Sequence, residues 1–427
     1  MNRLLAAALA WVCVTAIVVS TGQVRPATSS VPPLYHANPN HLWNRIHDVF
    51  QVRVARDGTR HGLDTVDPQL WRETRHLLSG PSHARAVAVL DEFLSSHGER
   101  LIADPLRRAV FQHDLWSIFD WLVTTSDGDL TARRALMPRI ARVMRRVALG
   151  QQQIDALPDT YVLAAGSSAT ASQATSALPR DLLTVPSSWV SIEGTQPIVP
   201  QHASELGRSA FIVLWRVPEG APATRAYLQK LWEFPQPFVP DESFNLPRDG
   251  ELRVKINPAL PPVPDGTRIA LVRLMLLVDD RGSIRPTRLV QSVQLRTLGR
   301  SPSFAEWRMS REQLFAGNAG GLRPVSQNDR EYSTFSAKGL DPFEHERPAG
   351  TFEVPRILQS CAICHQTEFG PANESIRSIR GLLRPYTFSD SRHDRWARWF
   401  TQPILAAEAK SRTYEWGVLT GLWQSHQ

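Results

Sequence analysis

The sequence predicts a multidomain α+β protein, and three successive patterns along its 427 residues indicate this. Between residues 35 and 150, apolar residues recur at the spacing of amphipathic helices. Between residues 181 and 345, apolar runs and strict alternation are typical of β-strands. From residue 348 to 427 the pattern is again mainly helical. A chain of this length has room for several cores. We therefore expect an N-terminal α-helical domain, an antiparallel β-rich middle domain and a small, mainly α C-terminal domain.

The helical domain is predicted from start signals as well as from periodicity. The strongest helix begins at Asp104-Pro105, and its apolar stripe runs from Leu106 to Leu122. Proline is favoured in the first turn of a helix, where its missing N–H costs nothing. A further helix is expected from Asp129 to Gly150, with a bend at Pro138.

The β-rich domain follows a low-complexity run at residues 164–177, which reads as a linker. Residues 209–217 and 269–278 are apolar runs of strand length. The second run leads into Asp279-Asp280-Arg281-Gly282 and then into an alternating return strand. Because glycine supplies the backbone freedom of a tight turn, this pair predicts a β-hairpin.

Neither of these two regions shows a catalytic pattern. The glycine cluster at residues 317–321 matches neither a dinucleotide-binding nor a phosphate-binding loop, and no nucleophile elbow occurs. The eight histidines between residues 36 and 113 lack the HxxxH or HExxH spacing of metal sites. We assign no catalytic residues and expect ordinary structural roles for these groups.

Charge and the N-terminus indicate the compartment and the class of partner. The net charge of +7 comes from arginines interleaved with acidic residues, so we expect no nucleic-acid binding, which needs a clustered basic patch. A mildly basic surface could equally steer an acidic redox partner or be an ordinary solvated surface. Residues 1–22 combine Arg3 with an apolar run and small residues, as in a secretory signal peptide or an uncleaved N-terminal anchor. We expect a periplasmic or cell-envelope location.

The most specific motif is Cys361-Ala362-Ile363-Cys364-His365. On a helix, positions i, i+3 and i+4 share one face. The two thiols can therefore form thioethers with the vinyl groups of one haem while the imidazole binds its iron. An accidental match, a redox dithiol and a zinc site completed by His393 are the alternatives. Haem attachment is favoured, because no βαβ pattern and no second paired zinc motif accompany the cysteines.

From residue 348 onward the chain resembles the haem-binding part of a c-type cytochrome. The resemblance rests on the CxxCH motif and on Gly370-Pro371, which is similar to the loop that follows the motif in small cytochromes c. It implies one covalent haem c, attached at Cys361 and Cys364, with His365 as axial ligand. By the same resemblance, Pro371 could accept the N–H of that histidine.

The sixth ligand departs from the usual pattern of this family. Small electron-transfer cytochromes c supply a methionine downstream of the motif, but all five methionines of this chain lie upstream. The options are His393, an upstream group such as Met309 or His345, or an open position. We favour His393, because the other downstream histidine, His426, is the penultimate residue, where chains fray.

These observations favour electron transfer to an unidentified redox partner protein over catalysis. The first alternative is a haem enzyme or small-ligand sensor with an open iron position. The second is a secreted binding protein with a structural zinc ion. Electron transfer is preferred because no distal catalytic constellation can be identified.

Overall fold

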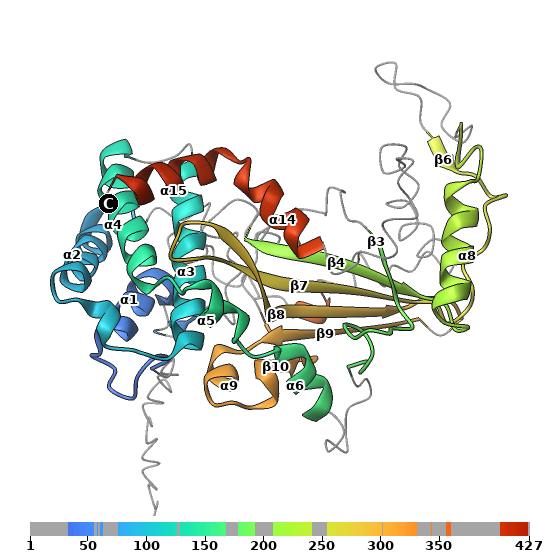
Figure 1. Ribbon diagram of the computed structural model, residues 1–427, viewed down its shortest axis with the longest axis horizontal. Helices are drawn as coiled ribbons and strands as arrows, with labels where there is room; N and C mark the ends of the chain where they lie inside the picture. Colours follow the sequence, from blue (N-terminus) through green and yellow to red (C-terminus); the bar gives the residue numbers. More distant parts are fainter. Residues whose placement is uncertain are drawn as a thin grey trace, which may run out of the picture.

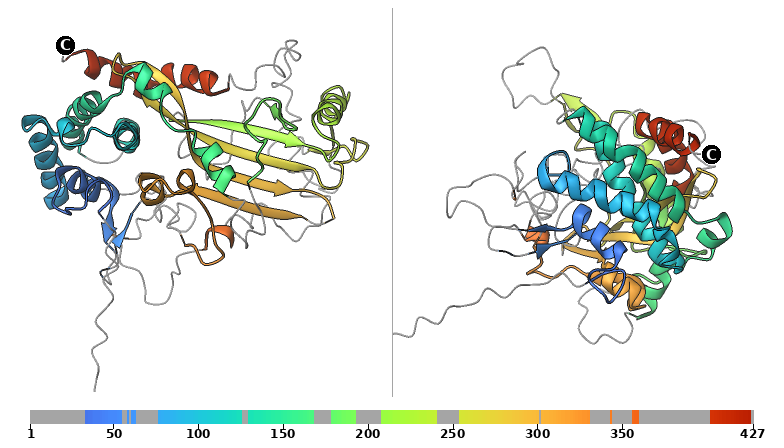
Figure 2. Two further views of the ribbon diagram at one scale, coloured as in Figure 1. Left: turned by 60° about the horizontal axis from the view of Figure 1, so that its bottom comes forward. Right: turned by 90° about the vertical axis from the view of Figure 1, so that its left-hand side faces the viewer.

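The described residues form helices, a six-stranded antiparallel sheet and two short two-stranded pairs, which confirms the predicted α+β class (Figure 1). The structure, a computed structural model, describes residues 33–54, 58, 60–62, 76–125, 129–167, 178–192, 208–240, 254–300, 302–330, 343, 356–359 and 402–425. A bundle of helices lies at one end and the sheet at the other, and the last two helices cross from one to the other (Figure 2).

The bundle contains the helices predicted in the N-terminal part of the chain. Its members are α1 (Leu42–Gln51), α2 (Gly80–Ser95), α3 (Pro105–Thr124) and α4 (Leu130–Val147). The residues before α3 and α4 are both aspartates, and each side chain accepts a hydrogen bond from a free backbone N–H of the first turn. A short two-stranded ribbon, β1 (Arg53–Val54) and β2 (Arg60–His61), follows α1.

Helix α3 is the central element of the bundle. The sequence predicts one apolar stripe on it, whereas the structure buries almost every side chain from Ala109 to Val123. Four of the buried residues are polar or charged: Gln112, His113, Asp114 and Asp120. A helix buried on all sides needs partners for such groups, because an unpaired polar group in the interior is costly.

The sheet has six strands in the order β10-β9-β8-β7-β4-β3, all antiparallel. The strands are β3 (Val190–Ile192), β4 (Ser209–Arg216), β7 (Arg268–Val278), β8 (Ile284–Thr297), β9 (Ser303–Met309) and β10 (Leu322–Pro324). The predicted hairpin is the β7–β8 pair. Its turn is closed by the buried Asp279, which accepts hydrogen bonds from the backbone of Arg281 and Ser283, while Gly282 takes a positive φ of 77°.

The remaining elements are short or lie at the margins of the sheet. They are α5 (Gln151–Asp155), α6 (Thr160–Ser167), α8 (Ala221–Trp232), α9 (Arg311–Phe315), the 3₁₀ turns η2 (Gly98–Arg100) and η3 (Ala319–Gly321), and the pair β5 (Phe238–Pro240) and β6 (Val254–Ile256). Helix α6 reaches into the predicted linker at 164–177, and Ala164 and Ala165 are buried; residues 168–177 lie outside the described part. Helix α8 was not expected within the β-rich region.

Two C-terminal helices, α14 (Gln402–Ser411) and α15 (Tyr414–Gln424), complete the fold. Helix α14 packs against β4 and β8, and α15 packs against α3 and α4 (Figure 2). The largest apolar cluster extends from Tyr35 to Trp423 and includes residues of the bundle, the sheet and α15. All three predicted regions of the chain therefore contribute to one apolar core.

Candidate functional site

The residues predicted to hold haem, Cys361, Cys364, His365 and His393, lie outside the described residues. The chain on either side of them is fixed to the body of the protein. Upstream, Arg356 forms an antiparallel bridge with Arg330, and the N–H of the buried Ile357 donates to the carbonyl of Asp329 at 2.9 Å. Downstream, the chain resumes in α14. The structure thus shows where the chain joins the core before and after this segment, and the chemistry of the segment is inferred from its sequence.

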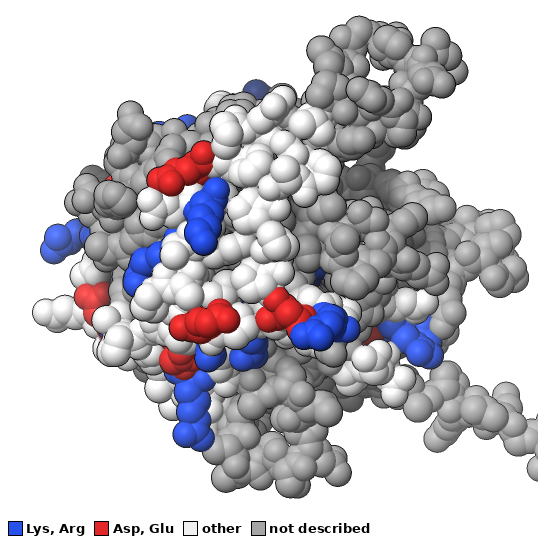
Figure 3. Space-filling view, turned by 90° about the vertical axis from the view of Figure 1, so that its right-hand side faces the viewer, with Lys and Arg blue, Asp and Glu red and all other residues white. Residues whose placement is uncertain are grey.

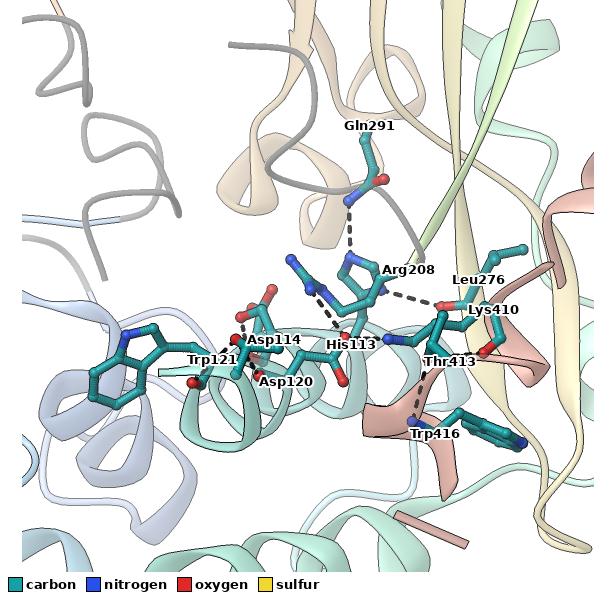
Figure 4. Close-up of polar contacts among 12 residues, drawn as sticks. His113, Asp114, Asp120, Trp121, Arg208, Leu276, Gln291, Lys410, Thr413 and Trp416 are labelled. Carbon is teal, nitrogen blue, oxygen red and sulfur yellow. Dashed lines mark hydrogen bonds and ion pairs between the residues drawn. The ribbon is translucent and has the colours of Figure 1, made fainter. Parts of the chain in front are cut away.

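Within the described chain, buried polar side chains gather around α3, where the bundle meets the sheet. Gln112 donates to the carbonyl of Val278 at 2.8 Å and accepts from its N–H at 3.0 Å. His113 lies between the carbonyl of Leu276, 3.1 Å from Nδ1, and the amide of Gln291, 2.9 Å from Nε2 (Figure 4). These contacts replace ladder hydrogen bonds at the end of β7. Both nitrogens of His113 are occupied, so it is not a free metal ligand.

The second group on α3 is a buried ion triad formed by Asp120, Arg208 and Lys410 (Figure 4). The Asp120 Oδ2 atom lies 3.1 Å from Nη1 of Arg208 and 2.7 Å from Nζ of Lys410. All three side chains are at least nine-tenths buried. Arg208 immediately precedes β4 and Lys410 lies on α14, so one carboxylate joins three distant parts of the chain. The ammonium of Lys410 also lies 5.7 Å from the ring of Trp116.

The charge of the triad is offset by Glu415 on α15. Two cations share one carboxylate, which leaves an excess positive charge in the interior. Burial raises the pKa of Glu415, but hydrogen bonds from its own backbone and from Thr413, together with Lys410 and Arg208, bring that pKa below its usual value. A second carboxylate near the triad is therefore held in its charged form.

A second buried ion pair lies nearer the start of α3. Asp114 receives a bidentate contact from Arg311, with Nη2 at 2.6 Å and Nε at 3.0 Å. The hydroxyl of Tyr35 lies 3.5 Å from the same carboxylate. Burial and the adjacent Asp114 charge raise the pKa of Tyr35 well above its usual value. The pair connects α3 with α9 and the start of the described chain.

His47 on α1 is buried beside this pair. Its ring makes an edge contact with Tyr35 at 5.8 Å between centroids, and its Nδ1 has no hydrogen-bond partner. Burial lowers the pKa of His47 to about 4; the Asp114 charge opposes this shift, and the Arg311 and Arg60 charges reinforce it. His47 is therefore neutral at physiological pH.

The described methionines are part of the core. Met144 and Met275 are fully buried, and Met309, one of the upstream ligand options, is buried in β9 in an apolar cluster with Leu277 and Leu314. Met137 packs against the main core. His345, the other upstream option, lies outside the described residues. A methionine of the described chain would have to leave its packed position to bind a metal ion.

The described residues contain no cluster of three or more His, Cys, Asp or Glu side chains suited to a metal ion. None of their helices is long and apolar enough to span a membrane. Basic and acidic residues are intermingled among the described residues on the face that Figure 3 shows. On and directly after α8, the side chains of Arg225, Lys230 and Glu233 are exposed. Most polar groups around α3 are paired with one another, although the Oδ1 atom of Asp120 has no hydrogen-bond partner. This pairing suits a structural role better than a catalytic one.

Sequence reasoning did not identify the ion triad. The one available signal is Lys410 itself, because lysine is rare in this arginine-rich chain and this one ends the stretch Ala406-Ala407-Glu408-Ala409. Pairing across such separations cannot be read from local periodicity. Comparison of the chain with protein-family models, with curated proteins and with solved structures found no match.

Replacing Asp120 by Asn should lower the free energy of unfolding by about 3–5 kcal/mol, because Arg208 and Lys410 would lose the buried carboxylate between them and leave Glu415 as the carboxylate that faces both cations. Chemical denaturation measures this loss. The matched control is Asp91→Asn, which breaks the ion pair of Asp91 with Arg139 at a half-exposed position and should cost less than about 1 kcal/mol. Equal small losses for both variants would contradict the assigned role of Asp120.

The low pKa of His47 predicts a loss of stability in acid. In the unfolded chain His47 has a pKa of about 6.5, whereas in the folded chain it is protonated only near pH 4. Protonation of His47 should therefore lower the free energy of unfolding by about 3 kcal/mol as the pH drops from 6.5 to 4. His47→Phe, which keeps the ring beside Tyr35, should show a smaller fall over that window. Parallel pH profiles for the two proteins would refute the prediction.

Proposed function

We propose that this protein is an exported mono-haem c-type cytochrome-like protein that transfers electrons through covalently attached haem. The observation that carries the proposal is the motif Cys361-Ala362-Ile363-Cys364-His365. It supplies two thiols and an imidazole at the spacing that one haem requires. The apolar run after Arg3 supports export, because c-type haem is attached outside the bacterial cytoplasm.

The chain's own residues would act as follows. Cys361 and Cys364 would form the two thioethers with the haem vinyl groups, and His365 would bind the iron. Bound haem would supply a reversible one-electron couple. The chain is fixed at Ile357 before the motif and at Lys410 after it. The motif-bearing segment is therefore tethered at both ends to the common core, and not joined through a single linker.

His393 is our proposed sixth ligand. The burial of Met137, Met144, Met275 and Met309 in or against the core supports a ligand other than methionine. Ligation by two histidines lacks the thioether that raises the potential of His/Met haems, so a comparatively low potential follows. We propose that the redox partner is a protein.

The covalent haem predicts a specific result on denaturing gels. Protein matured in a bacterial periplasm should retain haem stain after denaturation, because thioether bonds survive the loss of the fold. Cys361→Ser and Cys364→Ser should each weaken this retention. Met309→Leu, a substitution of similar volume within the core, is the control and should leave it unchanged. Stoichiometric zinc and no haem in the native protein would refute the proposal and favour the zinc-binding alternative.

The spin state of the iron tests His393. If His393 is the sixth ligand, ferric wild-type protein should be low-spin, and His393→Ala should be high-spin and bind carbon monoxide when reduced. His426→Ala is the matched control and should remain low-spin. A wild-type iron that is already high-spin would show an open position and favour catalysis or ligand sensing instead.

A further inference from the structure

Helix α14 presents its side chains in an unusual arrangement. Its buried face consists of Pro403, Ala407 and Lys410, at positions i, i+4 and i+7, and the half-buried Ala406 packs against the main core beside them. Its large aliphatic residues point outward: Ile404 is 50% exposed and Leu405 is 43% exposed, whereas Lys410 is 3% exposed. An amphipathic helix normally has the opposite arrangement.

Apolar packing therefore contributes little to the docking of α14 on the sheet. Proline and alanine bury small side chains, and the area removed from water sets the hydrophobic stabilisation. The one large side chain beneath the helix is that of Lys410, which ends at Asp120. Its contact is ionic, and its methylene stem is the only long apolar part.

Helix α15 docks mainly through large apolar side chains. Trp416, Leu419 and Trp423 are all buried in the main core, and the ring of Trp416 lies 6.0 Å from that of Trp116. Arg145 also donates to the carbonyl of Trp423 at 2.8 Å. The two helices meet at the exposed residues Ser411 and Arg412, after which Thr413 caps α15. Thr413 also donates its N–H and its hydroxyl to the carbonyl of Lys410, both at 3.0 Å, so these two bonds must open if α14 leaves while α15 stays.

We propose that α14 is a detachable strap, fastened to the sheet by the Asp120–Lys410 ion pair and released as a unit while α15 remains docked. Release exposes the surface of β4 and β8 that α14 covers. The proposal concerns the described helices alone and does not depend on whether haem is bound.

Native-state hydrogen exchange on the full chain tests this proposal. In wild-type protein, amides of α14 should exchange faster than those of α15 and β4, since partial opening costs less than global unfolding. Lys410→Met keeps the length and volume of the side chain and leaves Asp120 paired with Arg208, so the fold should survive. It should speed α14 exchange at least about tenfold and leave α15 within about twofold of wild type.

Two control variants distinguish loss of the buried Lys410 charge from other changes to α14. Lys410→Arg keeps the cation and should retain α14 protection near the wild-type level. Glu408→Gln changes an exposed charge on the same helix and should have no effect. Wild-type protection of α14 in Lys410→Met would overturn the proposal, and so would α14 and α15 opening together at the same rate. Slow exchange of α14 in wild type, equal to that of β4, would overturn it as well.

Discussion

The carboxylate of Asp120 is the constraint on which the rest of this structure depends. It lies on a helix buried on all sides, and it is neutralised by Arg208, 88 residues away, and by Lys410, 290 residues away. A buried charge without a partner costs several kcal/mol, so α3 can occupy the interior only when the sheet and the C-terminal helices are in place. The hydrogen bonds from Gln112 and His113 to β7 likewise tie the burial of α3 to the presence of the sheet.

Asp120 also holds one of the two attachment points of the chain segment that carries the proposed haem-attachment motif. The chain leaves the common core after Ile357 and returns to it in α14, whose buried lysine reaches Asp120. A motif tethered at both ends is coupled to the body of the protein more closely than one on a free tail.

The sequence was informative where local rules decide the structure. Asp104-Pro105 and Asp129 begin helices because their side chains cap free N–H groups, and the Asp279–Gly282 turn joins two strands because glycine permits a positive φ. It was uninformative where tertiary contacts override periodicity. On α14 the large aliphatic residues are exposed and Lys410 is buried, so apolar periodicity does not mark its inner face. Asp120 lies among apolar residues of α3, and nothing in the local sequence identifies its partners. The predicted haem ligands lie outside the described residues, so that part of the site remains a prediction from the motif.

The most direct test of the central functional claim is a pyridine haemochrome spectrum of the full chain matured in a bacterial periplasm. Two thioether bonds give a spectrum distinct from that of haem with free vinyl groups. Our account predicts the two-thioether spectrum, at one haem per chain, with Cys361→Ser and Cys364→Ser each shifted toward the spectrum of a single bond. A protein without haem, or with haem that organic solvent extracts, would contradict it.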